Sequence, residues 1–296
     1  MKQEPIGVGL LAQTACLWEA TARKPGNVHP HASFAQTGYM DFLLSAAAIQ
    51  FPLTVTFGSS VGEIVHLATK VTRSVVASNT NLGIILLLAP LVADAHDGPG
   101  FRRRVQKVVA SLTVEDAALV YEAIRLANPG GLGDSPEQDV HSEPTVTLLE
   151  AMKLAADRDM IARQYANGFA DIFDFGVPAL MDAFVKFGNV EAATVDCQLR
   201  WLAEFPDSLI VRKRGLAAAE DVRTRVREVL HLGGLASTEG RRAGNDLDRY
   251  LRSDGNKLNP GTTADLVTAC LFVALRENKV QPSSPFRWDA PDWLAP

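Results

Sequence analysis

Groups suited to binding anions or metal ions are concentrated at four places in this chain, each beside an apolar helical stretch. The last of them reads Asn259-Pro260-Gly261-Thr262-Thr263-Ala264-Asp265-Leu266, and the others lie at residues 23–30, 78–83 and 205–215. The N-terminus of a helix offers unpaired backbone N–H groups and the positive end of the helix dipole, and a glycine there lets an anion approach the main chain. We interpret the four segments as parts of one composite site that binds phosphate.

The segment at 259–266 has the composition of a phosphate cradle. Gly261, Thr262 and Thr263 would surround the anion. Asn259 stands just before them, and Asp265 one turn later would hold a divalent cation or order a water molecule. The alternative is that these residues only start a helix. Asn259 would then be the cap, the proline after it would take the first helical position, or Thr262 and Asp265 would form a capping box.

The turn at 78–83 has the same pattern. Asn79, Thr80, Asn81 and Gly83 precede the apolar run 84–88. They predict either ligand contacts or a plain helix cap, because Asn and Thr side chains accept hydrogen bonds from the first backbone N–H groups of a helix.

The segment at 23–30 follows an amphipathic helix and turns at Gly26. We expect Lys24 and His29 to contact phosphate oxygens and Asn27 to fix the loop around Gly26. Alternatively, Lys24 only complements the negative end of the helix dipole. A second histidine follows His29 two residues on, but no further group of ligand type stands at a short spacing, so we expect hydrogen bonding rather than zinc.

Composition narrows the class of protein. The 296 residues are 47% apolar, enough to bury a full core, and the net charge is −5. Affinity for a polyanion depends on clustered positive charge, so we do not expect a general nucleic-acid-binding protein. The three cysteines lack the paired short spacing of a zinc site or a disulfide framework. The longest apolar run, 82–92, is too short to span a bilayer, and we expect a cytoplasmic protein with no membrane partner.

Helical periodicity dominates the chain. Apolar residues recur three or four apart at 61–76, 114–126, 146–156, 190–205, 222–232 and 264–275. Ser60 with Glu63 and Thr113 with Asp116 have the spacing of capping boxes. The pattern predicts an all-α fold, a single compact domain of about a dozen helices over residues 1–280.

Two segments fall outside this pattern. The tail at 281–296 contains prolines together with Trp288 and Trp293, and we expect it to lie extended against the domain or against a second subunit of a homodimer. The glycine-rich stretch at 128–143 predicts a lid or a metal-bearing loop, with a disordered connection as the alternative.

Read in order, the four segments resemble the triphosphoribosyl-dephospho-CoA synthase family, which acts on ATP and dephospho-CoA. The resemblance covers most of the chain, from Glu19 to Glu277. It rests on a Lys-Pro-Gly stretch after the helical Glu19 and on three further marks: Asp41-Phe42 with Ser45-Ala46, Asn79-Thr80-x-x-Gly83, and the run at 259–266.

Three motifs depart from the family pattern. Asn81 and Leu82 stand where members that serve citrate lyase carry His and Lys. Asn-Pro-Gly-Thr-Thr at 259–263 replaces their Ser-Pro-Gly-Gly-Ser, and the stretch 130–140 replaces an Arg-Gly-Glu signature. The chain is therefore similar to a divergent branch that occurs in archaea and in methylotrophic bacteria. A fold carries over within such a branch, whereas a substrate does not.

The resemblance implies a reaction and the residues for it. A ribosyl hydroxyl of 3'-dephospho-CoA attacks C1 of the ATP ribose, adenine leaves, and the triphosphate stays on the transferred sugar. Mg²⁺ bridged to that triphosphate would be held by Glu19, Asp41 and Asp265, since hard oxygen ligands suit this ion. Asp41 or Asp207 would act as the base or stabilise the positive charge of the transition state.

The resemblance also bears on the basic run at 212–214. Arg212 and Arg214 lie beside Asp207 in a family-like segment and would hold the triphosphate. The alternative is a solvated helix face.

Two further functions stay open at this point. The same fold would serve a different acceptor, in the biosynthesis of a one-carbon carrier of the methanopterin type. Otherwise the chain is a helical protein that binds a phosphorylated ligand without turnover. In each case the expected partners are small nucleotide-like molecules.

Overall fold

The computed structural model describes residues 6–54, 58–94, 98–129, 138–290 and 292–294. Within these ranges the chain forms fourteen α-helices and no β-strand, which confirms the predicted all-α fold. The helices are α1 Val8–Thr21, α2 Tyr39–Gln50, α3 Val61–Val75, α4 Leu82–Val92, α5 Phe101–Ala110, α6 Val114–Ala127, α7 Leu148–Ala155, α8 Met160–Ala166, α9 Val177–Phe187, α10 Val190–Glu204, α11 Ser208–Arg214, α12 Leu216–His231, α13 Thr238–Arg252 and α14 Gly261–Arg276. A π-helical turn, Ile172–Gly176, precedes α9, and a 3₁₀ turn, Gly234–Ala236, precedes α13.

Local chemistry starts several of these helices. The side chain of Ser60 accepts a hydrogen bond from the Glu63 N–H at 3.2 Å, and the Glu63 carboxylate accepts one from the Ser60 N–H at 2.7 Å. Thr113 and Asp116 make the same reciprocal pair at the start of α6. Both predicted capping boxes are confirmed, because each needs only residues three positions apart.

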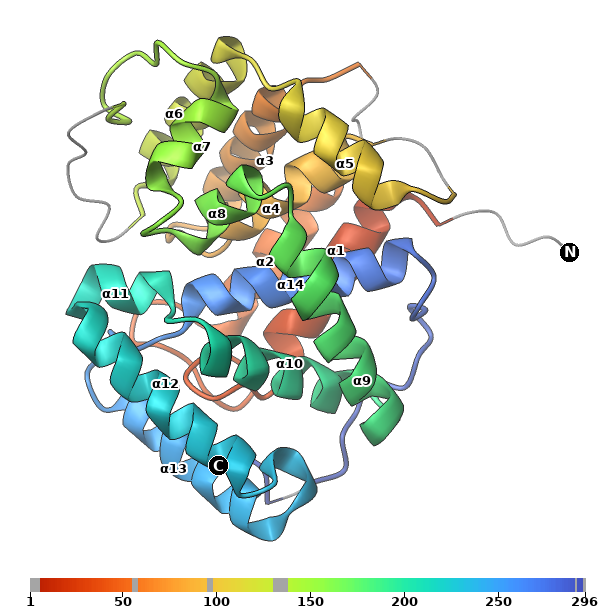
Figure 1. Ribbon diagram of the computed structural model, residues 1–296, viewed down its shortest axis with the longest axis vertical. Helices are drawn as coiled ribbons and strands as arrows, with labels where there is room; N and C mark the ends of the chain where they lie inside the picture. The colour runs from red at the N-terminus through yellow and green to blue at the C-terminus, as the bar shows by residue number, and fades with distance from the viewer. Residues whose placement is uncertain (1–5, 55–57, 95–97, 130–137, 291, 295–296) are drawn as a thin grey trace, which may run out of the picture.

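Two hydrophobic clusters form the core. The larger one joins α1 to α9 with α14, and the smaller one joins α10, α12 and α13 with the C-terminal segment. Figure 1 shows α14 crossing the middle of the molecule between these two halves. From Thr262 to Leu275, every residue of α14 except Asp265 is buried. An apolar helix of this kind can be stable only inside a protein, so α14 is the central element of the fold.

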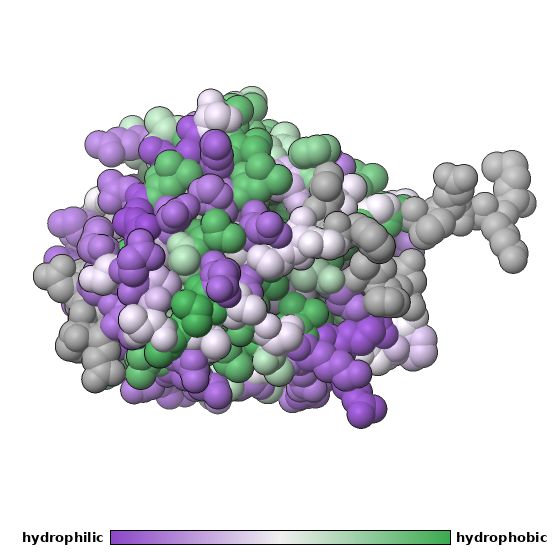
Figure 2. All heavy atoms as spheres, turned by 90° about the horizontal axis from the view of Figure 1, so that it is seen from above, coloured by the Kyte–Doolittle hydropathy of each residue, from purple (hydrophilic) through white to green (hydrophobic). Residues whose placement is uncertain are grey.

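The outer surface is mixed. Seen from the top of Figure 1, the molecule shows apolar side chains in small patches broken by hydrophilic ones (Figure 2). None of the helices in the described ranges combines the length and the apolar character needed to cross a membrane.

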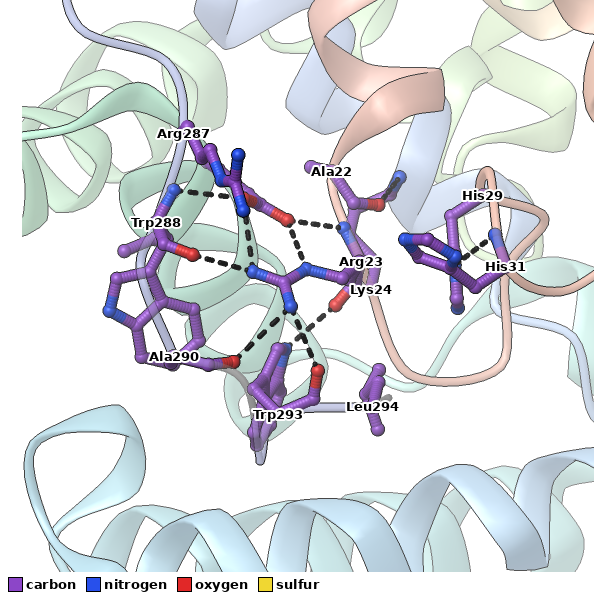
Figure 3. A network of polar contacts seen from close by, with 12 residues as sticks. Ala22, Arg23, Lys24, His29, His31, Arg287, Trp288, Ala290, Trp293 and Leu294 are labelled. Atoms are coloured by element: carbon purple, nitrogen blue, oxygen red, sulfur yellow. Dashed lines mark hydrogen bonds and ion pairs between the residues drawn. The ribbon is translucent and has the colours of Figure 1, made fainter. Parts of the chain in front are cut away.

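The C-terminal segment packs against the chain's own helices through Arg23 (Figure 3). The Arg23 guanidinium binds Glu191 on α10 at 2.6 Å and donates to the carbonyls of Trp288 at 2.7 Å, Ala290 at 3.2 Å and Trp293 at 3.1 Å. In return, the Trp293 indole N–H donates to the Arg23 carbonyl at 2.9 Å. Trp293 is fully buried. The tail that the sequence set apart is therefore part of the smaller core.

Half of the predicted lid at 128–143 lies outside the described part of the chain, at residues 130–137. On one side of it, Asn128 ends α6 in the left-handed conformation, with φ 47°. On the other side, the carbonyl of Gln138 accepts a hydrogen bond from the Tyr121 hydroxyl at 2.7 Å.

Replacing Trp293 with alanine tests whether the tail stabilises the domain. A buried tryptophan removed from a packed core costs about 3–5 kcal/mol. We therefore expect Trp293→Ala to lower the free energy of unfolding by about 3 kcal/mol or more in urea denaturation. Arg287→Ala is the control, because this side chain of the same segment is 87% exposed. It should change the free energy by less than about 0.5 kcal/mol. Equal effects of the two substitutions would contradict a structural role of the tail.

Candidate functional site

A cavity of about 1050 Å³ lies between the two halves of the molecule. Its walls are the C-terminal end of α1, the N-terminal ends of α4 and α14, and parts of α6, α7, α8 and α11 (Figure 1). The structure brings all four polar segments to this cavity. The predicted site residues that line it are Glu19, Asn27, Asn79, Thr80, Asn81, Gly83, Arg212, Asn259, Gly261, Thr262 and Asp265.

Four carboxylates line the cavity: Glu19 and Asp265, which were predicted as metal ligands, and Asp139 and Asp159. Glu19 is 4% exposed, and its Oε1 lies 2.9 Å from the Lys24 Nζ. Burial, and then the charge of Glu19, holds the pKa of Asp265 well above its usual range. A bound cation would therefore favour the charged form of Asp265. In the described ranges, no cluster of three or more His, Cys, Asp or Glu side chains forms a complete metal site.

Lys24 lies behind this wall rather than in it. The side chain is fully buried, and the ammonium group also donates to the carbonyl oxygens of Glu19 and Ala22. A buried lysine needs a charged partner, and Glu19 supplies it. The structure therefore places Lys24 outside the cavity lining, as the group that pairs with Glu19 and orients it.

The start of α4 packs directly onto Asp265. A Cβ atom at Gly83 would lie 2.0 Å from Oδ2 and 2.6 Å from Cγ of Asp265. Only glycine fits this approach. The Asn79 side chain accepts from the Leu82 N–H at 3.1 Å, and Asn81 donates to the Thr72 hydroxyl at 3.2 Å. The amides of this turn thus shape the N-terminal end of α4 while their outer surfaces line the cavity.

Asn259 is held by amides of other segments. Asn27 donates to Asn259 Oδ1 at 2.9 Å, and Gln198 on α10 donates to Asn27 Oδ1 at 2.7 Å. The first helical residue of α14 is Gly261, the residue before it is Pro260, and no side chain of this segment caps the helix, although Asp207 accepts from the Thr263 N–H in its first turn. The simple capping alternatives for this segment therefore do not describe the structure, and the N-terminal end of α14 faces the cavity.

Asp207 joins two helices instead of entering the cavity. This buried carboxylate caps α11 through the Leu209 and Ile210 N–H groups at 2.9 and 3.1 Å. Its other oxygen accepts from the N–H and the hydroxyl of Thr263 on α14, both at 2.8 Å. Burial raises the pKa of Asp207 even though these four hydrogen bonds oppose the shift. Asp207 and Thr263 hold the wall in place from behind, away from any ligand.

Asp41 also lies outside the cavity lining. Its carboxylate accepts from the Gly38 N–H at 2.8 Å at the start of α2. Its carbonyl accepts from the Ser45 hydroxyl, which in turn pairs with the hydroxyl of Thr80 in the cavity wall. The position of Asp41 is that of a helix cap that supports Thr80.

The remaining predicted residues are positioned away from the cavity. The Gly26 N–H donates to Asp248 at 2.7 Å, and the left-handed φ of 76° at Gly26 suits glycine. Arg214 pairs with Asp254. Asp254 lies in the connection before α14, and the pair ties α11 to that connection.

Three basic residues in the lining were not predicted: Arg73, Arg158 and Lys213. Lys213 makes no ion pair with any described residue, and burial, followed by the charge of Arg212, lowers its pKa. Arg212 binds Asp159 at 2.8 Å. The run at 212–214 gave a signal for Lys213, whereas the two other arginines belong to no motif. These residues and Arg212 form a cationic rim of the lining, which also contains the carboxylates of Asp139 and Asp159.

His29 is buried beside the site but does not line it. Its Nδ1 accepts from the His31 N–H at 3.3 Å, and its buried Nε2 has no hydrogen-bond partner. Burial, with Arg252 and Lys24 nearby, lowers the pKa of His29 to about 3. A neutral imidazole of this kind offers a phosphate no positive charge.

The comparisons with known proteins agree on one family. The profile of the ATP:dephospho-CoA triphosphoribosyl transferases, the CitG family, matches residues 7–284. A solved structure from Archaeoglobus fulgidus, provisionally named a triphosphoribosyl-dephospho-CoA synthase, superposes with a TM-score of 0.63 at 29% sequence identity. The superposition covers 79% of this chain and 98% of that one.

Two bacterial relatives are provisionally named 2-(5''-triphosphoribosyl)-3'-dephosphocoenzyme-A synthases. The protein from Pseudomonas savastanoi pv. phaseolicola is 33% identical over 38% of this chain and 39% of its own length. The one from Pseudomonas syringae pv. tomato is 32% identical over 42% of this chain and 43% of its own length. The chain thus matches about two fifths of the length of these relatives.

The low pKa of His29 predicts a loss of stability in acid. Between about pH 6.5 and pH 3 the unfolded chain binds a proton at this histidine and the folded chain does not, so stability falls as the pH falls. From about pH 7.5 to pH 5 the contribution is about 2 kcal/mol. We expect His29→Gln to reduce the acid-induced change in unfolding free energy by that amount, measured by urea denaturation at both pH values. An unchanged pH dependence in the variant would contradict the buried neutral state.

Proposed function

Because this chain belongs to the ATP:dephospho-CoA triphosphoribosyl transferase family, we propose that it transfers the triphosphoribosyl group of ATP to 3'-dephospho-CoA. In this reaction the acceptor hydroxyl forms a C–O bond to C1 of the ATP ribose while the bond from C1 to adenine breaks. The hydroxyl loses one proton, adenine gains one, and the triphosphate stays on the transferred sugar. The observation that supports the proposal most strongly is the meeting of four polar segments around Glu19 and Asp265 in one cavity.

The cationic rim and the helix ends suit the triphosphate. Arg73, Arg158, Arg212 and Lys213 line the cavity and supply charge-assisted hydrogen bonds. The N-terminal ends of α4 and α14 add the positive ends of two helix dipoles. We place the triphosphate between these groups, where its charge is compensated from several sides.

The carboxylate pair suits Mg²⁺. This ion takes oxygen ligands and commonly uses one or two protein carboxylates together with substrate phosphates and water. Glu19 and Asp265 fit that donor set, and burial and the charge of Glu19 hold the pKa of Asp265 above its usual range, which a bound cation would offset. When bound there, Mg²⁺ would neutralise and orient the triphosphate.

The same two carboxylates explain how the chain would favour departure of adenine. Positive charge develops on the ribose as the bond from C1 to adenine lengthens, and fixed negative charge nearby stabilises it. Glu19 in its ion pair with Lys24, and Asp265 in its charged form, would supply that charge from a partly water-excluded wall, where electrostatic interactions are strong. Asp41 and Asp207 act through position: one caps α2 and the other joins α11 to α14.

Asp265→Asn tests the catalytic role. Burial already disfavours the charged form of Asp265, so the amide should fold normally while losing the charge. We expect the rate of adenine release from ATP, Mg²⁺ and dephospho-CoA to fall by about 10²–10³-fold, measured by chromatography. Asp246→Asn is the control, because that side chain is 68% exposed on α13, and it should keep the wild-type rate.

The wild-type protein decides between catalysis and binding alone in the same assay. Release of adenine that depends on dephospho-CoA supports the transfer. Binding of ATP without any release of adenine would contradict it and would favour a protein that binds a phosphorylated ligand without turnover.

Lys213 and Arg214 form a matched pair for testing where the triphosphate binds. They are neighbours on α11, but Lys213 lines the cavity and Arg214 pairs with Asp254 outside it. We expect Lys213→Ala to raise the KM for ATP about tenfold, the loss of one charge-assisted hydrogen bond, and Arg214→Ala to change it less than twofold. The reverse order of effects in steady-state kinetics would place the triphosphate elsewhere.

A further inference from the structure

One side of the cavity is apolar. It is formed by residues of α6, α7 and α8: Val120, Ile124, Leu148, Ala151, Met152 and Ile161. Val120 and Leu148 are fully buried from solvent and still border the cavity, while Met152 is 9% exposed. Most of the polar lining described above comes instead from α1, α3, α4, α11, α14 and their adjoining connections, and Arg158 comes from the connection between α7 and α8. The cavity is therefore divided between two chemical surfaces.

The size of the cavity indicates more than one ligand group. Sites for a single drug-sized molecule have volumes of roughly 300–1,000 Å³. At about 1050 Å³ this cavity is at the upper end of that range. Apolar walls that enclose empty space forfeit packing contacts, and native interiors contain few such voids. The hollow beside α6 and α7 is thus suited to an apolar or uncharged part of a ligand.

The proposed transfer requires two molecules to be bound together, and they differ in how much of each molecule is uncharged. ATP carries charge along its whole triphosphate. The acceptor carries its reacting hydroxyl on a ribose, and beyond its diphosphate it continues into the uncharged pantetheine arm. Only the acceptor has a long segment without charge. The six residues named above carry no charge, and Arg158 and Asp159, which also line the cavity, lie in the connection between α7 and α8.

We infer that the wall formed by α6, α7 and α8 binds the pantetheine arm of the acceptor and that Ala151 and Met152 on α7 determine acceptor choice. This inference rests on the proposed function. Met152 provides a flexible, polarisable surface of the kind that adapts to a chain-like ligand. Ala151 keeps the wall open, because a larger side chain there would occupy the hollow.

Blocking the wall tests the inference. Dissociation constants for dephospho-CoA and for ATP with Mg²⁺ are measured by calorimetry on the wild-type protein, Ala151→Trp and Lys153→Trp. Lys153 lies on the exposed face of the same helix and does not line the cavity. We expect Ala151→Trp to weaken dephospho-CoA binding by about tenfold or more while ATP binding changes less than twofold. Lys153→Trp should leave both unchanged.

The inference is overturned if Ala151→Trp binds dephospho-CoA as tightly as the wild type, or if it loses ATP and dephospho-CoA affinity equally. Met152→Gln, which nearly preserves volume, gives an independent answer should the tryptophan variant fail to fold. It should weaken dephospho-CoA binding severalfold and leave ATP binding unchanged, and equal affinities would again overturn the inference.

The two proposals fail in different ways. Selective loss of dephospho-CoA affinity in Ala151→Trp, in a protein that never releases adenine, supports the wall and contradicts the transfer. A wild-type protein that does not bind dephospho-CoA at all contradicts both.

Discussion

The buried ion pair between Lys24 and Glu19 is the interaction on which the site depends. A lysine and a glutamate out of contact with water are stable only as partners, and breaking such a pair leaves an uncompensated buried charge. Here the pair ends α1 and turns the Glu19 carboxylate toward the cavity. The preceding residue, Arg23, binds Glu191 and three carbonyl groups of the C-terminal segment. Two consecutive residues thus connect the larger core, the smaller core and the proposed catalytic wall.

The polar residues around the cavity divide into two groups with different tasks. Asp207 and Asn27 use their hydrogen bonds to hold helix ends and loops together. Asp265, by contrast, is a carboxyl group with a raised pKa at the cavity surface, pressed against the backbone of Gly83. The first group has its hydrogen-bond partners within the protein, whereas a bound cation would stabilise the charged form of Asp265. Rigid support behind a reactive wall is what transition-state electrostatics requires.

The sequence predicted the helices well because helix formation depends on neighbours. The capping box of Ser60 and Glu63 and the apolar periodicity of 264–275 both act within a few residues. The meeting of the polar segments was predicted from their shared composition beside apolar helical stretches, and the family resemblance agreed with it. The sequence did not predict which polar residues line the cavity and which support it from behind, because that depends on burial produced by distant parts of the chain. Neighbours such as Lys213 and Arg214 have similar chemistry, and only the packing of α11 decides which of them reaches the cavity.

The central claim is that Glu19 and Asp265 hold one metal ion on the triphosphate of ATP. The most direct measurement is a crystal structure with ATP and Mn²⁺, which replaces Mg²⁺ and is located by its anomalous scattering. We expect one anomalous peak that lies within about 2.5 Å of a carboxylate oxygen of Glu19 and of one of Asp265, and that contacts the triphosphate. A triphosphate bound with its metal away from these two carboxylates would contradict it.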